Sequence, residues 1–204
     1  MDFPKCDYQD IYAFALEKCL KRCKWLAVLV PESFLRSGLF RERLSDFISL
    51  TSSLFSDTAH PVGLALFTPK KVEETVVWSG EKKLGALSEI EALRPQANPR
   101  KADVKFNRQN GNVGLLALDN TKTASIRFCY PSELKGYKVR ESCRSITLVE
   151  TTVQVRIEEW NKALNSFREK THNVLMTPYR GLRADGRYRR RCDWDLARGI
   201  IQHV

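Results

Sequence analysis

The sequence of 204 residues has no apolar run that approaches the roughly 20 residues a membrane-spanning helix requires. Its N-terminus also lacks the basic and then apolar pattern of a signal peptide. The six cysteines include no C-x-x-C pair, and the three histidines, His60, His172 and His203, are too scattered for the ligand spacing of a structural zinc site. These absences favour a cytoplasmic protein with reduced thiols, no metal site and no membrane contact.

Acidic residues are scarce in one half of the chain. Residues 1–97 contain 13 Lys and Arg and 13 Asp and Glu, whereas residues 98–204 contain 21 and 11, so the second half carries the whole net charge of +10. Between them, Arg94–Lys101 carries two prolines and no apolar periodicity, which is typical of a boundary. We therefore expect two domains, 1–97 and 98–204, of which the second meets a polyanion.

The most informative pattern in the first half is the short apolar run Leu26–Val30, which ends at Pro31. An unbroken apolar run is typical of a strand buried on both faces of a parallel sheet. Residues 8–23 place apolar side chains at helical spacing, including Cys19 and Cys23, whose thiols we expect to pack as small hydrophobes. A one-sided helix followed by a two-sided strand indicates an open α/β sheet.

Further elements are expected on both sides of the boundary. Phe40–Phe55 fits a helix by its apolar period and a strand by its Ser/Thr-rich end, and both alternatives stay open. Helices are expected within residues 85–93 and 156–170. Gly63 indicates close approach by another backbone. Strands are expected at Val62–Phe67, Thr75–Trp78, Val104–Phe106, Val113–Leu118, Ser125–Tyr130 and Ser145–Val149.

The first 69 residues resemble a known enzyme family. The pattern consists of Tyr8-Gln-Asp-Ile-Tyr12, Phe14-Ala-Leu-Glu-Lys-Cys-Leu20, Ala27-Val-Leu-Val-Pro-Glu-Ser-Phe34, Leu54-Phe55 and Pro61-Val-Gly-Leu-Ala-Leu-Phe67. It is similar to restriction-modification DNA methyltransferases, which methylate adenine N6 with S-adenosylmethionine. The resemblance implies that residues 1–69 are the rear part of a Rossmann-like catalytic domain. Leu26–Val30 would be its fifth strand, and Val62–Phe67 would close its final hairpin.

The fold class that follows is α/β. A partial Rossmann-like methyltransferase sheet is expected in residues 1–97, followed by a mixed α+β target-recognition domain in residues 98–204.

Two motifs of that family are absent. Its members bind S-adenosylmethionine with a Gly-rich turn after the first strand and grip the adenine amino group with Asn-Pro-Pro-Tyr or a close relative. The only Asn-Pro of this sequence is Asn98-Pro-Arg100, and its only clustered glycines are Gly111-Asn-Val-Gly114, far into the basic half. We therefore expect no catalytic and no cofactor-binding residue in this chain. A second polypeptide or a missing N-terminal region would bring S-adenosylmethionine and the catalytic loop.

The resemblance assigns one aromatic residue a role. In the family, an aromatic residue just before the last sheet hairpin stacks on the adenine flipped out of the duplex, which would be Phe55 here. The alternative is that Phe55 packs the end of a helix or strand.

The stretch 177–194 is the densest basic and aromatic segment of the sequence. Arginines can pair with DNA phosphates, and one or two can read a guanine. Gly181, Gly186 and the interleaved aromatic residues favour a shaped DNA-binding loop over a solvated, poorly ordered tail. The candidate contacts with double-stranded DNA are Arg180, Arg183, Arg187, Arg189, Arg190, Arg191, Lys105 and Arg108.

Together these patterns predict a fragment or subunit of a site-specific DNA adenine N6-methyltransferase. It would contribute sheet completion, base stacking and DNA recognition, and it would be an enzyme only together with the cofactor-binding half. The alternative is a catalytically inert DNA-binding module derived from such an enzyme.

Overall fold

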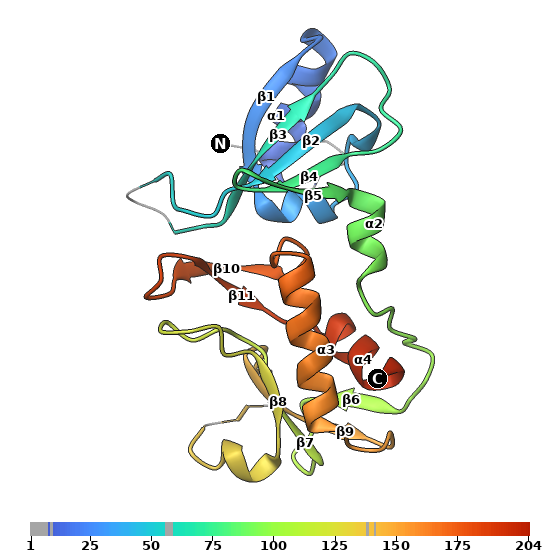
Figure 1. Cartoon of the computed structure of the whole chain (residues 1–204), viewed down its shortest axis with the longest axis vertical. Helices are drawn as coiled ribbons and strands as arrows, with labels where there is room; N and C mark the ends of the chain where they lie inside the picture. Colours follow the sequence, from blue (N-terminus) through green and yellow to red (C-terminus); the bar gives the residue numbers. More distant parts are fainter. Residues whose placement is uncertain (1–7, 9, 56–58, 138, 141) are drawn as a thin grey trace.

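The computed structural model describes residues 8, 10–55, 59–137, 139–140 and 142–204, and it shows a mixed α/β protein with two lobes (Figure 1). The upper lobe contains a five-stranded sheet in the order β1-β3-β2-β4-β5. Its elements are α1 (Ile11–Arg22), β1 (Leu26–Pro31), the 3-10 turns η1 (Glu32–Arg36) and η2 (Arg41–Arg43), β2 (Leu44–Ser49), β3 (Val62–Phe67), β4 (Val76–Ser79), β5 (Lys82–Ala86) and α2 (Leu87–Ala92).

The lower lobe contains a four-stranded sheet in the order β6-β9-β7-β8 and a separate β10–β11 hairpin. Buried side chains of both lobes belong to one continuous hydrophobic cluster. The elements are β6 (Val104–Phe106), β7 (Val113–Leu116), β8 (Arg127–Cys129), η3 (Pro131–Leu134), β9 (Ile146–Thr151), α3 (Ile157–Lys170), β10 (Thr177–Leu182), β11 (Tyr188–Arg191) and α4 (Trp194–His203).

The direction of the upper strands places three strand ends together. β3 pairs antiparallel with both β1 and β2, so β1 and β2 run parallel to each other, and β2 pairs parallel with β4. The carboxyl ends of these three strands, at Pro31, Ser49 and Ser79, therefore lie at the same edge of the sheet. This edge faces the lower lobe, because η1 directly follows β1 and packs against β10.

The predicted strand at Leu26–Val30 is confirmed as β1, but its expected environment is wrong. β1 is an edge strand that pairs antiparallel with β3 rather than lying inside a parallel sheet. Its burial alternates, with Val30 buried and Leu29 43 % exposed. One face of the sheet is covered by α1 and η1, where the Phe34 ring packs edge-on against Tyr12 and Phe67. None of the described helices covers the opposite face at β1 in this way.

Apolar side chains line that opposite face of the sheet. Leu29 of β1 lies beside Leu64 of β3, which in turn lies beside Ile48 of β2. Leu64 and Ile48 are only partly buried. The row therefore remains accessible although its composition is typical of a covered sheet face. We call it the open sheet face.

The helix predicted before this strand is confirmed as α1, although part of its apolar stripe is not covered. Leu16 and Leu20 are buried, whereas Ile11 is 64 % exposed. Cys19 and Cys23 are also exposed, so the prediction that their thiols pack as small hydrophobes is wrong. Fewer apolar side chains of α1 pack against the sheet than the sequence pattern indicates.

Two uncertainties of the sequence are resolved within the upper sheet. The segment 40–55 forms a strand, β2, after the short turn η2, and β5 was not expected from the sequence. Gly63 does mark a close approach, but the neighbour is a side chain rather than a backbone. A Cβ atom at Gly63 would lie 2.2 Å from the ring of Phe47.

In the lower lobe, the predicted strands correspond to β6, β7, β8 and β9, and the helix predicted at 156–170 is α3. The basic stretch 177–194 forms the β10–β11 hairpin and the start of α4, so the alternative of a poorly ordered tail is wrong. None of the helices formed by the described residues has both the length and the apolar composition that crossing a membrane requires.

Candidate nucleic-acid interface

A polar cleft of about 700 Å³ lies where the carboxyl ends of β2 and β4 meet the lower lobe. The upper lobe lines it with Ser49, Ser79 and Lys82, and the lower lobe with residues of the hairpin and the end of α3. In open α/β sheets, ligands bind in the crevice outside the carboxyl ends of the strands. The position of the cleft therefore makes it the leading candidate for a binding site.

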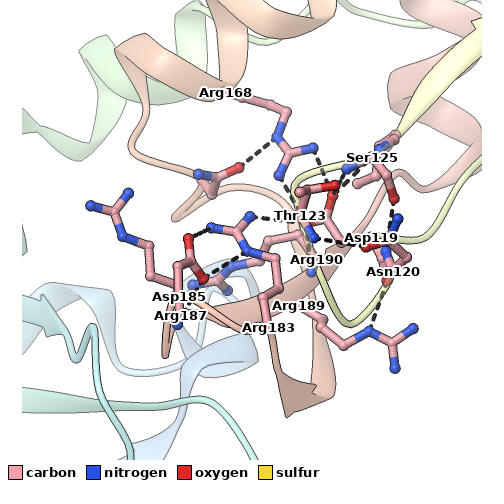
Figure 2. Close-up of polar contacts among 12 residues, drawn as sticks. Asp119, Asn120, Thr123, Ser125, Arg168, Arg183, Asp185, Arg187, Arg189 and Arg190 are labelled. Carbon is pink, nitrogen blue, oxygen red and sulfur yellow. Dashed lines mark hydrogen bonds and ion pairs between the residues drawn. The ribbon is translucent and has the colours of Figure 1, made fainter.

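A buried carboxylate organises the arginines on the lower wall of the cleft. The Asp119 side chain is fully buried and receives Arg168 through two parallel hydrogen bonds of 3.0 and 2.9 Å. The Arg183 guanidinium lies 3.6 Å from the same carboxylate. The backbone N–H of Ser125 donates to it at 2.8 Å, as Figure 2 shows. Asp119 therefore balances part of the charge that would otherwise drive these guanidinium groups apart.

A second buried carboxylate joins the two lobes. Glu32, the first residue after β1, forms an ion pair with both terminal nitrogens of Arg190 in β11, and it accepts a hydrogen bond from Ser49 at the end of β2. Nearby, Arg36 of η1 lies 3.2 Å from Asp193, which caps α4. A buried ion pair is strongly destabilising when one partner is removed, because the remaining charge stays desolvated. Glu32 and Arg190 thus hold the walls of the cleft in place.

The six predicted arginines of the hairpin region therefore fall into different environments. Arg183 and Arg190 are buried in the ion pairs described above. Arg189 donates to the Asp119 carbonyl at 2.7 Å and lies over the ring of Tyr179. The remaining three, Arg180, Arg187 and Arg191, are exposed or only partly buried.

The other two predicted DNA contacts lie elsewhere. Lys105 of β6 is 3.3 Å and Arg108 is 3.9 Å from the Glu150 carboxylate on β9. Neither residue lines the cleft. Figure 1 shows β6 and the hairpin on different sides of α3. The structure does not bring these two residues together with the hairpin arginines.

Phe55 lies in the segment between β2 and β3, and its side chain is 42 % exposed. Its backbone is held locally by Ser53, whose hydroxyl donates to the Phe55 carbonyl at 2.8 Å. Further along this segment, the Ala59 carbonyl accepts a hydrogen bond of 3.0 Å from Gly181 in β10. The segment and the hairpin extend in the same direction from the molecule (Figure 1). Phe55 is thus an exposed aromatic residue on a loop attached to the basic hairpin, not a core residue.

Sequence reasoning missed Asp119, Glu32, Lys82 and His172. Only a weak sequence pattern points to the two carboxylates: each follows an apolar strand segment in a chain with excess arginine. The contact between Lys82 and His172 joins residues 90 positions apart, and neither lies in a recognisable motif. His172 Nε2 is 2.9 Å from Lys82 Nζ. The pKa of His172 is lowered by burial and then by the charges of Lys82 and Arg187.

The described residues contain no cluster of three or more His, Cys, Asp or Glu side chains that could hold a metal ion. Comparison with family models, curated proteins and solved structures finds no match to this chain.

Proposed function

We propose that this chain is the DNA-recognition and base-stacking part of an adenine N6-methyltransferase and that duplex DNA binds across the cleft. One observation carries the proposal. A polar cleft at the carboxyl ends of parallel strands is walled by an ordered arginine-rich hairpin, and a loop with an exposed aromatic residue, Phe55, is hydrogen-bonded to that hairpin. Phosphate contacts position DNA, and an aromatic face replaces the stacking that a flipped base loses.

The sheet order supports the resemblance on which this proposal draws. Two segments that carry part of it, Leu26–Val30 and Val62–Phe67, lie in β1 and β3, and the strand that precedes Leu54-Phe55 in the sequence is β2. These strands are immediate neighbours in one sheet, with β3 in the middle. A rear portion of a Rossmann-like domain is the finer fold assignment that we propose for them.

The residues present do not fit S-adenosylmethionine. The cofactor carries a positively charged sulfonium, whereas Lys82 and four arginines outnumber the two acidic residues, Glu169 and Asp185, in the lining of the cleft. The clustered glycines offer no open turn, because a Cβ at Gly111 would meet the Val149 backbone at 2.7 Å and one at Gly114 would meet the Cys129 sulfur at 2.7 Å. A second polypeptide, or a region that precedes these residues in a longer chain, would therefore hold the cofactor, and the described residues would bind and position DNA without performing the methyl transfer.

The open sheet face supports a second polypeptide. The apolar run of β1 has the composition of a strand covered on both faces, yet the described residues cover only the face under α1 and η1. β1 is also an edge strand, which presents unpaired backbone groups that another strand can extend. We propose that the cofactor-binding half of the methyltransferase continues the sheet at β1.

The DNA-binding part of the proposal is tested by salt dependence. Each lost phosphate contact makes the slope of log K against log salt shallower by about 0.9. Replacing Arg180, which is exposed, and Arg191, which is partly buried, with Gln should therefore reduce the slope by up to about 1.8 while the fold is retained. Arg190 is left intact because its removal would leave the buried Glu32 carboxylate without its ion-pair partner. Lys101→Gln with Lys162→Gln is the matched control, since both lysines are exposed and outside the cleft.

The outcome of this series is decisive. A slope that is unchanged in the hairpin variant, or equally reduced in the control, would contradict DNA binding by the hairpin that walls the cleft. A parallel pair, Lys105→Gln with Arg108→Gln, shows whether the footprint extends to β6, as the sequence predicts.

A further inference from the structure

The rim of the cleft contains a small cluster outside the Asp119 and Glu32 ion pairs. Lys82 begins β5, His172 follows α3, and Arg187 lies in the turn between β10 and β11. All three line the cleft. Three elements from both lobes therefore present cationic or imidazole groups to one small region.

The cationic side chains of this cluster differ from the other cationic residues of the cleft in their ion pairing. Arg168, Arg183 and Arg190, the other cationic residues of the cleft, each have a buried acidic partner. Within the described part of the chain, neither Lys82 nor Arg187 forms an ion pair, and Figure 2 shows the Arg187 side chain directed away from Asp119. Asp185, the nearest acidic residue in the sequence, is held by Arg183 at 2.7 Å.

The pKa of His172 reflects the charged groups around its ring. Burial lowers its pKa first, and Lys82 from β5 and Arg187 from the hairpin lower it further, while Glu169 of α3 opposes them. The imidazole is therefore neutral near pH 7. Because the Lys82 ammonium can only donate, the His172 Nε2 that lies 2.9 Å away holds a lone pair. An anion placed here would lie beside the positive charges of Lys82 and Arg187 and beside a neutral imidazole nitrogen that can accept a proton.

A further unused donor lies in the same wall. The hydroxyl of Tyr188 is buried and has no hydrogen-bond partner among the described residues. Tyr188 itself lines the cleft next to Arg187. A buried hydroxyl without a partner is unusual in a folded protein.

We propose that Lys82, His172 and Arg187 form a binding site for one phosphate group, and that His172 takes up a proton from the buffered solvent when the phosphate binds. The proton adds to Nε2, the Lys82 ammonium turns from Nε2 to a phosphate oxygen, and the imidazolium donates to another. This inference rests on the proposed function, in which the phosphate is a phosphodiester of the bound DNA. Free phosphate has the same chemistry and is the other source.

The test measures duplex DNA binding by the full chain over a range of salt and pH. Lys82→Gln and Arg187→Gln should each make the salt slope shallower by up to about 0.9, the contribution of one phosphate contact. Lys83→Gln is the matched control, because Lys83 neighbours Lys82 but lies over the Trp78 ring, outside the cleft. Its slope should equal that of the wild type.

The pH arm isolates His172. Bound phosphate raises the histidine pKa, so wild-type binding should tighten as the pH falls from 8 to 6. His172→Asn should bind as the wild type does at pH 8 and lose that tightening. Asn is chosen because position 172 has a φ of 47°, a left-handed conformation that Asn tolerates. A pH response that persists in His172→Asn would overturn the proton uptake.

Titration with inorganic phosphate, followed by the NMR signal of the His172 ring, separates this inference from the proposed function. A shifted ring signal without DNA binding would support the site, assign it to free phosphate and overturn the proposed function. DNA binding with wild-type slopes for Lys82→Gln and Arg187→Gln, and no shift of the ring signal, would overturn this site and leave the proposed function standing. A shift together with shallower slopes supports a DNA phosphodiester.

Discussion

At the residue scale, Phe55 offers the sharpest test of a base-stacking role. A flipped adenine loses stacking, and an aromatic side chain recovers roughly 1–3 kcal/mol of it. Phe55→Ala should therefore slow methylation by the complete assembly about 10- to 100-fold, whereas Phe55→Trp retains most of the rate. Because Phe55 is 42 % exposed, the melting temperature should stay unchanged. The rate and the melting temperature are measured on the same preparations.

The neighbouring residue supplies the control for this prediction. Leu54 is 55 % exposed and apolar but has no π-face, so Leu54→Ala should leave the rate unchanged. DNA with an abasic target site should bind equally well to the wild type and to Phe55→Ala. Equal slowing by both alanine variants would instead mean that the loop, and not the ring of Phe55, matters.

The buried carboxylates show where residue-level prediction stops. The tail composition correctly indicated an ordered, arginine-rich loop, but it could not separate the arginines that face solvent from Arg183 and Arg190, which are buried in ion pairs. Their partners, Asp119 and Glu32, are 64 and 158 residues away in the sequence. No local pattern encodes such pairings, because Arg183 meets Asp119 only once the lower lobe has folded, and Arg190 meets Glu32 only where the two lobes join.

At the element scale, the packing of β2 on β3 depends on the absence of a side chain at Gly63. Its Cβ would overlap the fully buried ring of Phe47, so Gly63→Ala should lower the free energy of unfolding by about 1–3 kcal/mol. Phe47→Leu should relieve the clash, making the double variant more stable than the sum of the two changes implies. Urea unfolding measures all three. Gly136→Ala is the control, since its Cβ would meet nothing within 4 Å; an equal loss there would refute the steric explanation.

Local periodicity predicted most strands and helices but not their surroundings. Leu26–Val30 is a strand because β-branched and apolar residues favour one, and the following Pro31 ends the run. Whether such a strand is central or at an edge depends on its neighbours, and this information is not local. β5 was missed for a related reason: Lys82 and Lys83 give it a polar start, and its pairing with β4 compensates for weak propensity.

At the scale of the whole molecule, the cleft is a consequence of how the lobes join. The parallel strands direct their carboxyl ends toward the lower lobe, and the Glu32–Arg190 pair and the Arg36–Asp193 pair hold the hairpin against that edge. The hydrophobic cluster that runs through both lobes opposes their separation. Sequence alone placed a boundary near residue 97, but it gave no indication that buried charge would cross between the two sides.

The open sheet face leads to the last prediction. If the cofactor-binding half of a methyltransferase continues the sheet at β1, a charge on this face should prevent assembly without unfolding the chain. Leu29 is 43 % exposed, so Leu29→Lys should change the free energy of unfolding by no more than about 0.5 kcal/mol. Burial of an unpaired lysine in the interface would cost far more. Co-purification with a polypeptide that carries the Gly-rich turn and Asn-Pro-Pro-Tyr, and methylation by the mixture, should both be lost.

Leu93→Lys controls for the added charge, because Leu93 has a similar exposure of 42 % but follows α2, away from β1. It should preserve assembly and methylation. DNA binding by the isolated chain should be the same for both variants and the wild type, since neither position lines the cleft. Assembly that survives Leu29→Lys would show that the partner docks elsewhere. Failure of the wild type to assemble with any such polypeptide, while its DNA binding persists, would favour a module that recognises DNA and takes no part in methylation.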